Sequence, residues 1–274
     1  MSIRRETVLF LSALLHEERR RRGTRRGRRA ITCFTQAVLI WRWFLDNTRI
    51  TQLATDHGIS RTTAYRYLHE GIDVLAAMAP DLCGVLEEAK KAGLTHVNLD
   101  GIVIATDRVS TPGPGPADLW WSGKHKHHGG NIRVISAPDG WPLWVSDVRP
   151  GREHDITCAR HHGVITTLAA IRPDLPTLAD LGYEGAADVV RIPIKKKSGQ
   201  PKLGHDQHTY NKLLRGLRGI GERANALLTI TFKALRRVSL DPSRIGKIAQ
   251  AALVLLNHEH NWTMSASHNV IFSY

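Results

Sequence analysis

Three acidic residues occur in segments where a carboxylate is unusual. Asp100 interrupts an apolar, strand-like run, Asp180 ends a second short apolar run, and Glu222 opens a long helical pattern. Burying an ionised carboxylate is costly unless it is paired or binds a metal ion. In a chain with a formal net charge of +13, these residues indicate a divalent-metal site in a protein that binds a polyanion. That combination favours phosphodiester chemistry on nucleic acid.

Magnesium suits such a site, because Mg²⁺ prefers oxygen ligands and keeps water and substrate phosphate in its remaining positions. Two such ions, roughly 3.5–4 Å apart, activate the attacking oxygen and stabilise the leaving oxygen of an in-line displacement. Asp100 is then the natural bridging ligand, because a central strand fixes it most rigidly. The alternative is that these acidic residues are surface residues or helix caps.

The helical pattern around Glu222 predicts which side of that helix is buried. Spacing of i, i+3/i+4 predicts a core stripe of Leu217, Ile220, Ala224, Leu227, Thr231 and Leu235. Glu222 then shares the other side with Asn225, Thr229, Lys233 and Arg236, so this side would face the site and the DNA. A position in the first turn would also favour the ionised carboxylate.

Composition restricts the class of protein. The 274 residues are enough to bury a real core, and a hydrophobic content of 42% excludes a disordered chain. The 38 Lys and Arg against 25 Asp and Glu are clustered, which favours a nucleic-acid partner over a merely soluble basic protein. Three scattered cysteines indicate a reducing cytoplasm. No apolar run is long enough to span a bilayer, so we expect no membrane partner.

The elements that must position these residues fall into two groups. The first part of the chain predicts helices only, over 30–45, 51–75 and 82–92. Strands follow over 97–104, 131–137, 143–148 and 177–179, mixed with helices over 155–171, 220–238 and 242–258 and a basic loop over 192–210. We therefore predict a helical DNA-binding domain over 1–92, an α/β domain over 93–262 and a C-terminal tail over 263–274.

A helix-turn-helix pattern runs from Ile50 to Leu68. Ala54 allows close helix crossing, Gly58 takes the turn, and Ser60 can cap the second helix. The residues of the second helix suited to base edges and phosphates are Arg61, Thr62, Tyr65, Arg66 and His69. The alternative is an ordinary helical hairpin.

Basic segments accompany this pattern. An arm of eight arginines lies between Arg19 and Arg29, and it is expected along phosphates or in a minor groove rather than as a solvated charge run. Its predicted DNA contacts are Arg25, Arg26, Arg28 and Arg29. Lys124 and Lys126, in a histidine-rich segment, suit phosphate contact better than a zinc site.

Four segments in order resemble the insertion-sequence transposases of the DDE-superfamily endonucleases, which include the Harbinger-like enzymes. They are Leu99-Asp100-Gly101, Pro150-Gly151-Arg152-Glu153-His154-Asp155, Ala179-Asp180-Leu181-Gly182-Tyr183 and Gly221-Glu222-Arg223-Ala224-Asn225. The resemblance implies a ribonuclease H-like fold, a mixed central sheet flanked by helices. It also implies that Asp100, Asp180 and Glu222 are the catalytic, metal-binding triad, with Asp155 as a fourth acidic group near the metals. Leu181 departs from the polar residue of many relatives.

By this resemblance we expect a cut-and-paste transposase that uses two Mg²⁺ ions, for which Mn²⁺ could substitute. It would bind terminal inverted repeats and target DNA as a homodimer or larger assembly, in the bacterial cytoplasm with the nucleoid. No phosphate-binding Gly-rich loop is evident, so no nucleotide cofactor is expected. The alternatives are a non-catalytic, transposase-derived DNA-binding repressor and a metal-dependent nuclease without transposition.

Overall fold

The computed structural model describes residues 3–113, 118–196, 199 and 202–264. The predicted C-terminal tail lies outside this part except for residues 263 and 264. Within the described residues, no helix is long and apolar enough to cross a membrane.

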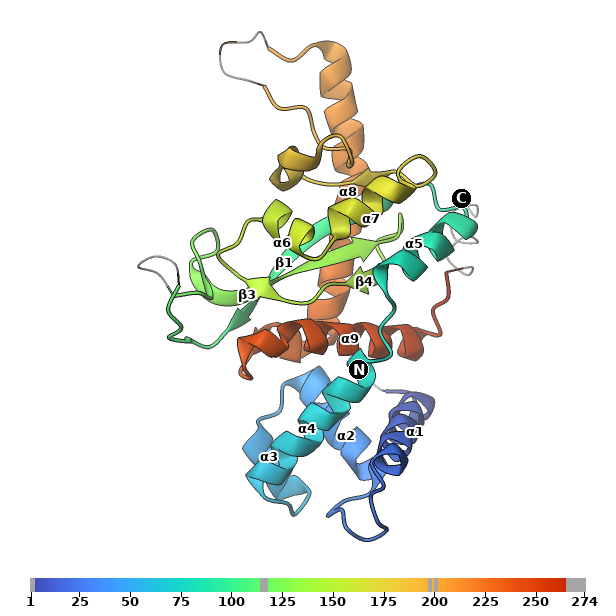
Figure 1. The fold of residues 1–274 in the computed structure, drawn as a ribbon, viewed down its shortest axis with the longest axis vertical. Helices are drawn as coiled ribbons and strands as arrows, with labels where there is room; N and C mark the ends of the chain where they lie inside the picture. Colours follow the sequence, from blue (N-terminus) through green and yellow to red (C-terminus); the bar gives the residue numbers. More distant parts are fainter. Residues whose placement is uncertain (1–2, 114–117, 197–198, 200–201, 265–274) are drawn as a thin grey trace.

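The chain begins with the helical part, in which the predicted helices are confirmed (Figure 1). Thr32 caps the second helix by accepting from the backbone N–H of Thr35, and that helix ends at Asn47 in a left-handed conformation. Side chains of the first, second and fourth helices interlock around a core that includes Leu11, Trp43 and Leu68. The helices are α1 (Arg5–Arg21), α2 (Cys33–Asp46), α3 (Ile50–Asp56) and α4 (Arg61–Ala76).

The following α/β part is built on a mixed sheet with β1 (Val97–Thr106) at its centre. β3 (His127–Ser136) lies antiparallel to β1, and its register places Gly101 opposite Arg133. β6 (Thr177–Leu178) pairs in parallel with the start of β1, and β7 (Arg237–Val238) with its end. The strands that extend the sheet beyond β3 are β2 (Trp121–Ser122), β4 (Pro142–Val145) and β5 (Arg149–Pro150).

Helices cover both faces of this sheet. α8 (His205–Thr231) lies against the face of β1 that carries Asn98 and Asp100. α6 (Asp155–His161) and the short helix η1 (Leu181–Ala186) lie on the opposite face, where Arg133 meets them. α7 (Val164–Ile171) packs between α6 and α5 (Leu82–Lys91), so α5 contacts the α/β part although the predicted boundary lies at residue 92.

The C-terminal helix α9 (Ile245–His260) lies between the two parts of the molecule (Figure 1). One of its sides packs on β4, and another packs on α4 and α1. Its residues belong to the same hydrophobic core as those of the helical part and the sheet. The short helices η2 (Lys233–Leu235) and η3 (Pro242–Arg244) connect α8 to α9.

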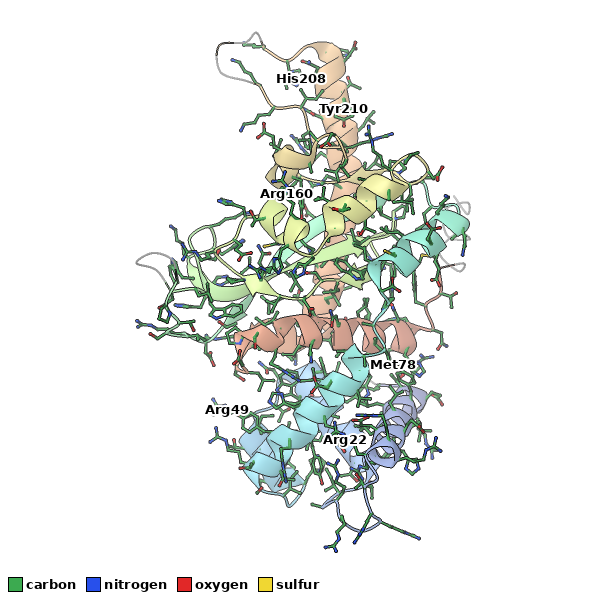
Figure 2. All side chains as sticks on the ribbon, viewed as in Figure 1. Arg22, Arg49, Met78, Arg160, His208 and Tyr210 are labelled. Carbon is green, nitrogen blue, oxygen red and sulfur yellow. The ribbon has the colours of Figure 1, made fainter. Side chains whose placement is uncertain are left out.

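Two helix predictions were wrong in their bounds. The helix expected over 155–171 is broken at Gly163, whose φ of 67° suits glycine and separates α6 from α7. α8 begins at His205, inside the expected basic loop, and ends at Thr231. Its first half projects from the sheet, and Figure 2 shows His208 and Tyr210 on this projection.

The predicted core stripe of α8 was also wrong in part. Leu217 and Ile220 are 43% and 46% exposed, whereas Gly221 and Ala224 are buried against the sheet. A Cβ on Gly221 would lie only 2.9 Å from the Cβ of Asn98. Close approach of helix and strand therefore selects small residues for the contact, which apolar spacing alone does not reveal.

Candidate active site and DNA-binding surface

Asp100 occupies a largely buried position on β1 beneath α8. Asn225 of α8 donates a hydrogen bond from Nδ2 to Oδ2 of Asp100 over 2.9 Å. Burial raises the pKa of Asp100, and the nearby charge of Asp180 raises it further, while the Gly101 N–H and the charges of two arginines oppose both effects. A bound cation would stabilise the ionised form of a carboxylate in such a position, because it offsets the cost of burying the negative charge.

Asp180 reaches the same place from the neighbouring strand. β6 pairs with β1 so that Thr177 lies beside Val97 and Leu178 beside Asn98. Continued for two residues, this parallel register brings Asp180 level with Asp100, in agreement with the electrostatic effect of Asp180 on Asp100. Asp180 also caps η1, because its Oδ1 accepts a 2.8 Å hydrogen bond from the Gly182 N–H.

Asp155 adjoins Asp180 across Gly182. Oδ1 of Asp180 and Oδ2 of Asp155 lie 2.9 and 3.1 Å from the place where a Cβ would project from Gly182. Oδ1 of Asp155 is paired with Nη1 of Arg133 over 2.8 Å. Burial alone would raise the pKa of Asp155, but the charge and hydrogen bond of Arg133 outweigh it and lower that pKa. Oδ1 of Asp155 is thus held by Arg133, and the role of Asp155 as a metal ligand stays a prediction.

Arg133 is the main residue of this region that the sequence reasoning missed. Its side chain is fully buried, passes over Gly101, and donates from Nη1 to the Tyr183 hydroxyl over 2.8 Å. It also donates to the side-chain oxygen of Asn131. A signal was present, since Arg133 interrupts an apolar strand just as Asp100 does.

Glu222 is exposed near the middle of α8, so the predicted stabilisation by a first-turn position was wrong. It precedes Asn225 by three residues and therefore shares its side of the helix. Within the described ranges, no group of three or more His, Cys, Asp or Glu side chains is arranged to hold a metal ion. Convergence of all three predicted carboxylates on shared ions therefore stays a prediction.

The residues around Asp100 nevertheless fit a hard cation. The side-chain oxygens of Asn98 and Asn225 are buried and have no hydrogen-bond partner within the described part of the chain. Both flank the Asp100 carboxylate, Asn225 through its hydrogen bond and Asn98 two residues before it on β1. Carboxylate and amide oxygens are the ligands that Mg²⁺, Mn²⁺ and Ca²⁺ take.

Comparison with known proteins supplies the family. A family model described as DDE superfamily endonuclease matches residues 99–257, from β1 to the end of α9. The chain belongs to this family. The mixed sheet flanked by helices is the ribonuclease H-like fold expected of a DDE endonuclease, so the predicted α/β class is confirmed.

Two further searches add little to this assignment. A solved structure of the Mos1 transposase paired-end complex with left transposon end is 13% identical over 85% of this chain and 77% of that chain, with a TM-score of 0.22. Such a score supports no argument about the DDE endonuclease described here. No curated protein matches the chain.

The segment predicted as a helix-turn-helix folds as α3, a turn and α4, and its role in binding DNA stays a prediction. Gly58 takes a φ of 61° in the turn, and Ser60 caps α4 by accepting a 3.2 Å hydrogen bond from the Thr63 N–H. Of the predicted contact residues on α4, Arg61, Thr62 and Arg66 are exposed, and Tyr65 and His69 are partly buried. These side chains therefore present a polar, basic face suited to a major groove.

The arginine arm differs from the free segment that was expected. Arg19 to Arg21 belong to α1, and Glu17 and Glu18 pair with Arg20, Arg21 and Arg22. These acidic partners relieve the self-repulsion that would otherwise keep the segment extended. Arg29 forms two hydrogen bonds, of 2.7 and 3.1 Å, with the buried carboxylate of Glu70, so it anchors the arm and is not a free phosphate contact. Arg25, Arg26 and Arg28 are exposed.

The remaining predicted DNA contacts lie apart from one another. Lys124 is 73% exposed, and its Nζ lies 3.7 Å from Oδ2 of Asp155, which places an exposed cation beside the acidic residues. Lys126 is exposed in the same turn. Lys233 instead pairs with Asp46 over 3.3 Å, and Arg236 donates to backbone carbonyls at the end of α8. Lys233 therefore links η2 to the end of α2, and Arg236 binds the last carbonyls of α8.

Proposed function

We propose that this DDE endonuclease is a cut-and-paste DNA transposase. The observation that supports this proposal is that β6 pairs in parallel with β1, so that Asp180, two residues after β6, follows the strand next to the one that carries Asp100. The same chain has the two helices and glycine turn of the predicted helix-turn-helix. Endonuclease activity follows from the family. Strand transfer, and recognition of terminal inverted repeats by α4, are the proposed extensions.

The chain's own residues divide the work at this site. Asp100 and Asp180 would hold the divalent ions together with Glu222, and the amide of Asn225 fixes the orientation of the Asp100 carboxylate. Mg²⁺ or Mn²⁺, when bound, supplies Lewis-acid stabilisation of the reacting phosphate oxygens. Lys124 lies where a cationic side chain can neutralise an approaching phosphate.

We propose DNA contacts at two places on the protein. The exposed residues of α4 would read the inverted repeat, and Lys124 and Lys126 would contact phosphates near the scissile bond. Because two element ends must be joined, we propose a homodimer or larger assembly on DNA, acting in the cytoplasm on the nucleoid.

The test compares Glu222→Gln with a matched control, Glu184→Gln. Both carboxylates are exposed on the α/β part, and Glu184 lies 3.8 Å from the ammonium group of Lys195. Each protein is incubated in Mg²⁺ with duplexes carrying the gene's flanking sequences, and strand nicking and joining are followed on denaturing gels. We expect E222Q to lose both activities by at least about 10³-fold while DNA affinity stays unchanged, and E184Q to match the wild type.

Three results would contradict the proposal in different ways. Full activity of E222Q would refute the three-carboxylate mechanism. Binding without nicking by the wild type in either Mg²⁺ or Mn²⁺ would favour the non-catalytic repressor. Nicking of any duplex without preference for the gene's flanks, and without joined products, would favour a nuclease that does not transpose.

A further inference from the structure

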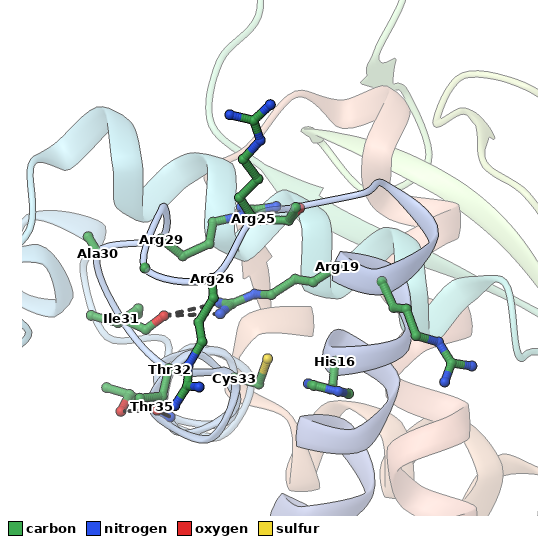
Figure 3. A pocket seen from close by; sticks show the side chains of 13 residues that line it. His16, Arg19, Arg25, Arg26, Arg29, Ala30, Ile31, Thr32, Cys33 and Thr35 are labelled. Carbon is green, nitrogen blue, oxygen red and sulfur yellow. Dashed lines mark hydrogen bonds between the residues drawn. The ribbon is translucent and has the colours of Figure 1, made fainter.

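A basic pocket lies beside the helix-turn-helix, between the end of α1, the loop that follows it and the start of α2 (Figure 3). Its volume is about 760 Å³. The cationic side chains that line it are Arg19, Arg20, Arg25, Arg26 and Arg29. No acidic residue lines it within the described part of the chain. An anion is therefore the ligand class that this pocket favours.

The loop that forms the pocket has a fixed conformation. The N–H of Thr24 donates to the carbonyl of Arg19 over 2.9 Å, and the N–H of Arg28 donates to the carbonyl of Arg25 over 3.3 Å. Its far end is tied to α4, because the N–H of Ala30 donates to the Tyr67 hydroxyl over 2.9 Å. The pocket therefore keeps a fixed position relative to the second helix of the helix-turn-helix.

A buried acidic residue of α4, Glu70, strengthens the attachment made by Tyr67. Glu70 is 6% exposed and accepts from both Arg29 and Gln36. Arg22, at the other end of the loop, lies 3.6 Å from the same carboxylate. Charge-assisted, bidentate pairs of this kind are the geometrically specific ones. Both ends of the arginine loop are thus held on the back of the helix whose exposed side would enter the major groove.

The start of α2 adds a second attraction for an anion. α2 has 14 residues, and the positive end of its dipole lies at the wall of the pocket, which Thr32, Cys33 and Thr35 form. The Thr35 N–H is already capped by Thr32. Figure 3 shows Arg26 reaching toward this end of α2. Arg19 already donates to the Ile31 carbonyl and to Gln36, and Arg20 and Arg29 are paired with glutamates. The guanidinium groups left without a partner among the described lining residues are those of Arg25 and Arg26. Guanidinium groups that converge with a helix N-terminus match the oxygens of a phosphodiester.

We propose that this pocket binds backbone phosphates of the same duplex that α4 reads, without regard to base sequence. The proposal rests on the proposed DNA-binding function. Of the two roles expected for the arginine arm, contact with phosphates and insertion into a minor groove, it selects the first. A minor-groove arm must extend into a groove about 6 Å wide. This loop is closed at both ends and presents its guanidinium groups around a hollow, which suits the outer surface of a phosphate backbone.

The test uses the double variant R25A/R26A. Both arginines are exposed, and their side chains form no hydrogen bond with other described residues. Binding to fluorescein-labelled 30-bp duplexes, one mixed, one A·T-rich and one G·C-rich, is measured by anisotropy in EDTA across a salt series. We expect the affinity for each duplex to fall by about 10-fold or more, and by the same factor for all three. The slope of log K against log salt should fall by about 2, since roughly 0.9 is lost per phosphate contact.

Two controls make the result specific. R5A/R172A removes the same charge from exposed positions outside the pocket and should leave the salt slope within about 0.5 of the wild type. R61A, on α4, should change the ranking of the duplexes, because it removes a contact in the groove. Thermal unfolding of each variant should match the wild type, as all these side chains are exposed.

The outcomes separate this proposal from the broader one. If the wild type binds DNA and R25A/R26A binds as tightly, the pocket proposal fails while DNA binding stands. A loss confined to the A·T-rich duplex would overturn it in favour of a minor-groove arm. If the wild type binds none of the duplexes, both proposals fail.

Discussion

The buried ion pair between Arg133 of β3 and Asp155 of α6 allows a direct test of what holds α6 against the sheet. Arg133→Met keeps the volume of the side-chain stem but removes the charge, and it leaves the Asp155 carboxylate and the Tyr183 hydroxyl without their common donor. Breaking a buried pair from one side costs about 3–5 kcal/mol. Asp155 retains 21% exposure while Arg133 has none, so water screens one partner and we expect the lower end, about 3 kcal/mol.

The assay is urea unfolding followed by circular dichroism. With a slope of about 3 kcal/mol per M for a chain of this size, R133M should lower the unfolding midpoint by about 1 M. Asp155→Asn alone should also destabilise the protein, and R133M/D155N should be more stable than the sum of both losses predicts, by about 1–3 kcal/mol. The control is Arg237→Met, which removes an exposed pair with Asp107 and should cost less than about 1 kcal/mol.

Two results would refute this reasoning. A cost for R133M no larger than that for R237M would mean that the buried pair does not hold the sheet to α6. Strict additivity in the double variant would mean that Arg133 and Asp155 do not stabilise one another.

The pH dependence of the free energy of unfolding gives an independent test of the ion pair. The pKa of Asp155 is lowered in the folded protein, so the stabilisation is present above the ordinary carboxyl pKa and is lost as the pH falls through the lowered one.

Three further predictions follow from the same geometry. Asp100→Asn should abolish nicking yet stabilise the protein by about 1 kcal/mol at pH 7, which raises Tm by about 2–4 °C. The reason is that burial raises the pKa of Asp100, so its ionised form costs stability above the ordinary carboxyl pKa. A Tm equal to or below that of the wild type would contradict this. Mn²⁺ at tenfold its Kd should stabilise the wild type by about 1.4 kcal/mol in thermal shift and leave D100N unchanged, whereas equal shifts would place the ion elsewhere. In urea unfolding, Gly140→Ala should destabilise the fold more than Gly163→Ala. Both glycines have positive φ, which costs an alanine about 1–2 kcal/mol. Of the two, Gly140 is the one at which an added Cβ would meet a backbone carbonyl, that of Ile220.

Much of the fold was predictable because its signals are local. The turn of the helix-turn-helix follows from Gly58 and Ser60, whose backbone freedom and capping hydroxyl act within a few residues. β1 follows from its apolar run, and the break before residue 97 follows from Gly93, which takes a φ of 71° after α5. The bounds of α8 were not predictable in this way, because its first half projects from the sheet and its contacts with β1 are made by small residues.

The candidate site was predictable in its carboxylates and not in its partners. Asp100 and Asp180 each stand out against apolar neighbours, and the parallel pairing of β6 with β1 brings them level. Arg133 is remote in sequence from both Asp155 and Tyr183, so only the register of β1 with β3 reveals that it reaches them. In the same way, the attachment of Arg29 to Glu70 spans 41 residues and has no local signature.

The position of α9 decides what an incomplete copy of this protein can do. Because α9 contacts α4 on one side and β4 on the other, a helix that is made after both parts of the molecule is needed to complete the core of the helical part. A product that stops before residue 245 would expose the apolar back of α4, including Leu68, Ile72 and Leu75, which are fully buried in the intact chain. Frameshifted or prematurely stopped alleles should therefore be insoluble or quickly degraded, rather than persist as short competitors for the DNA ends.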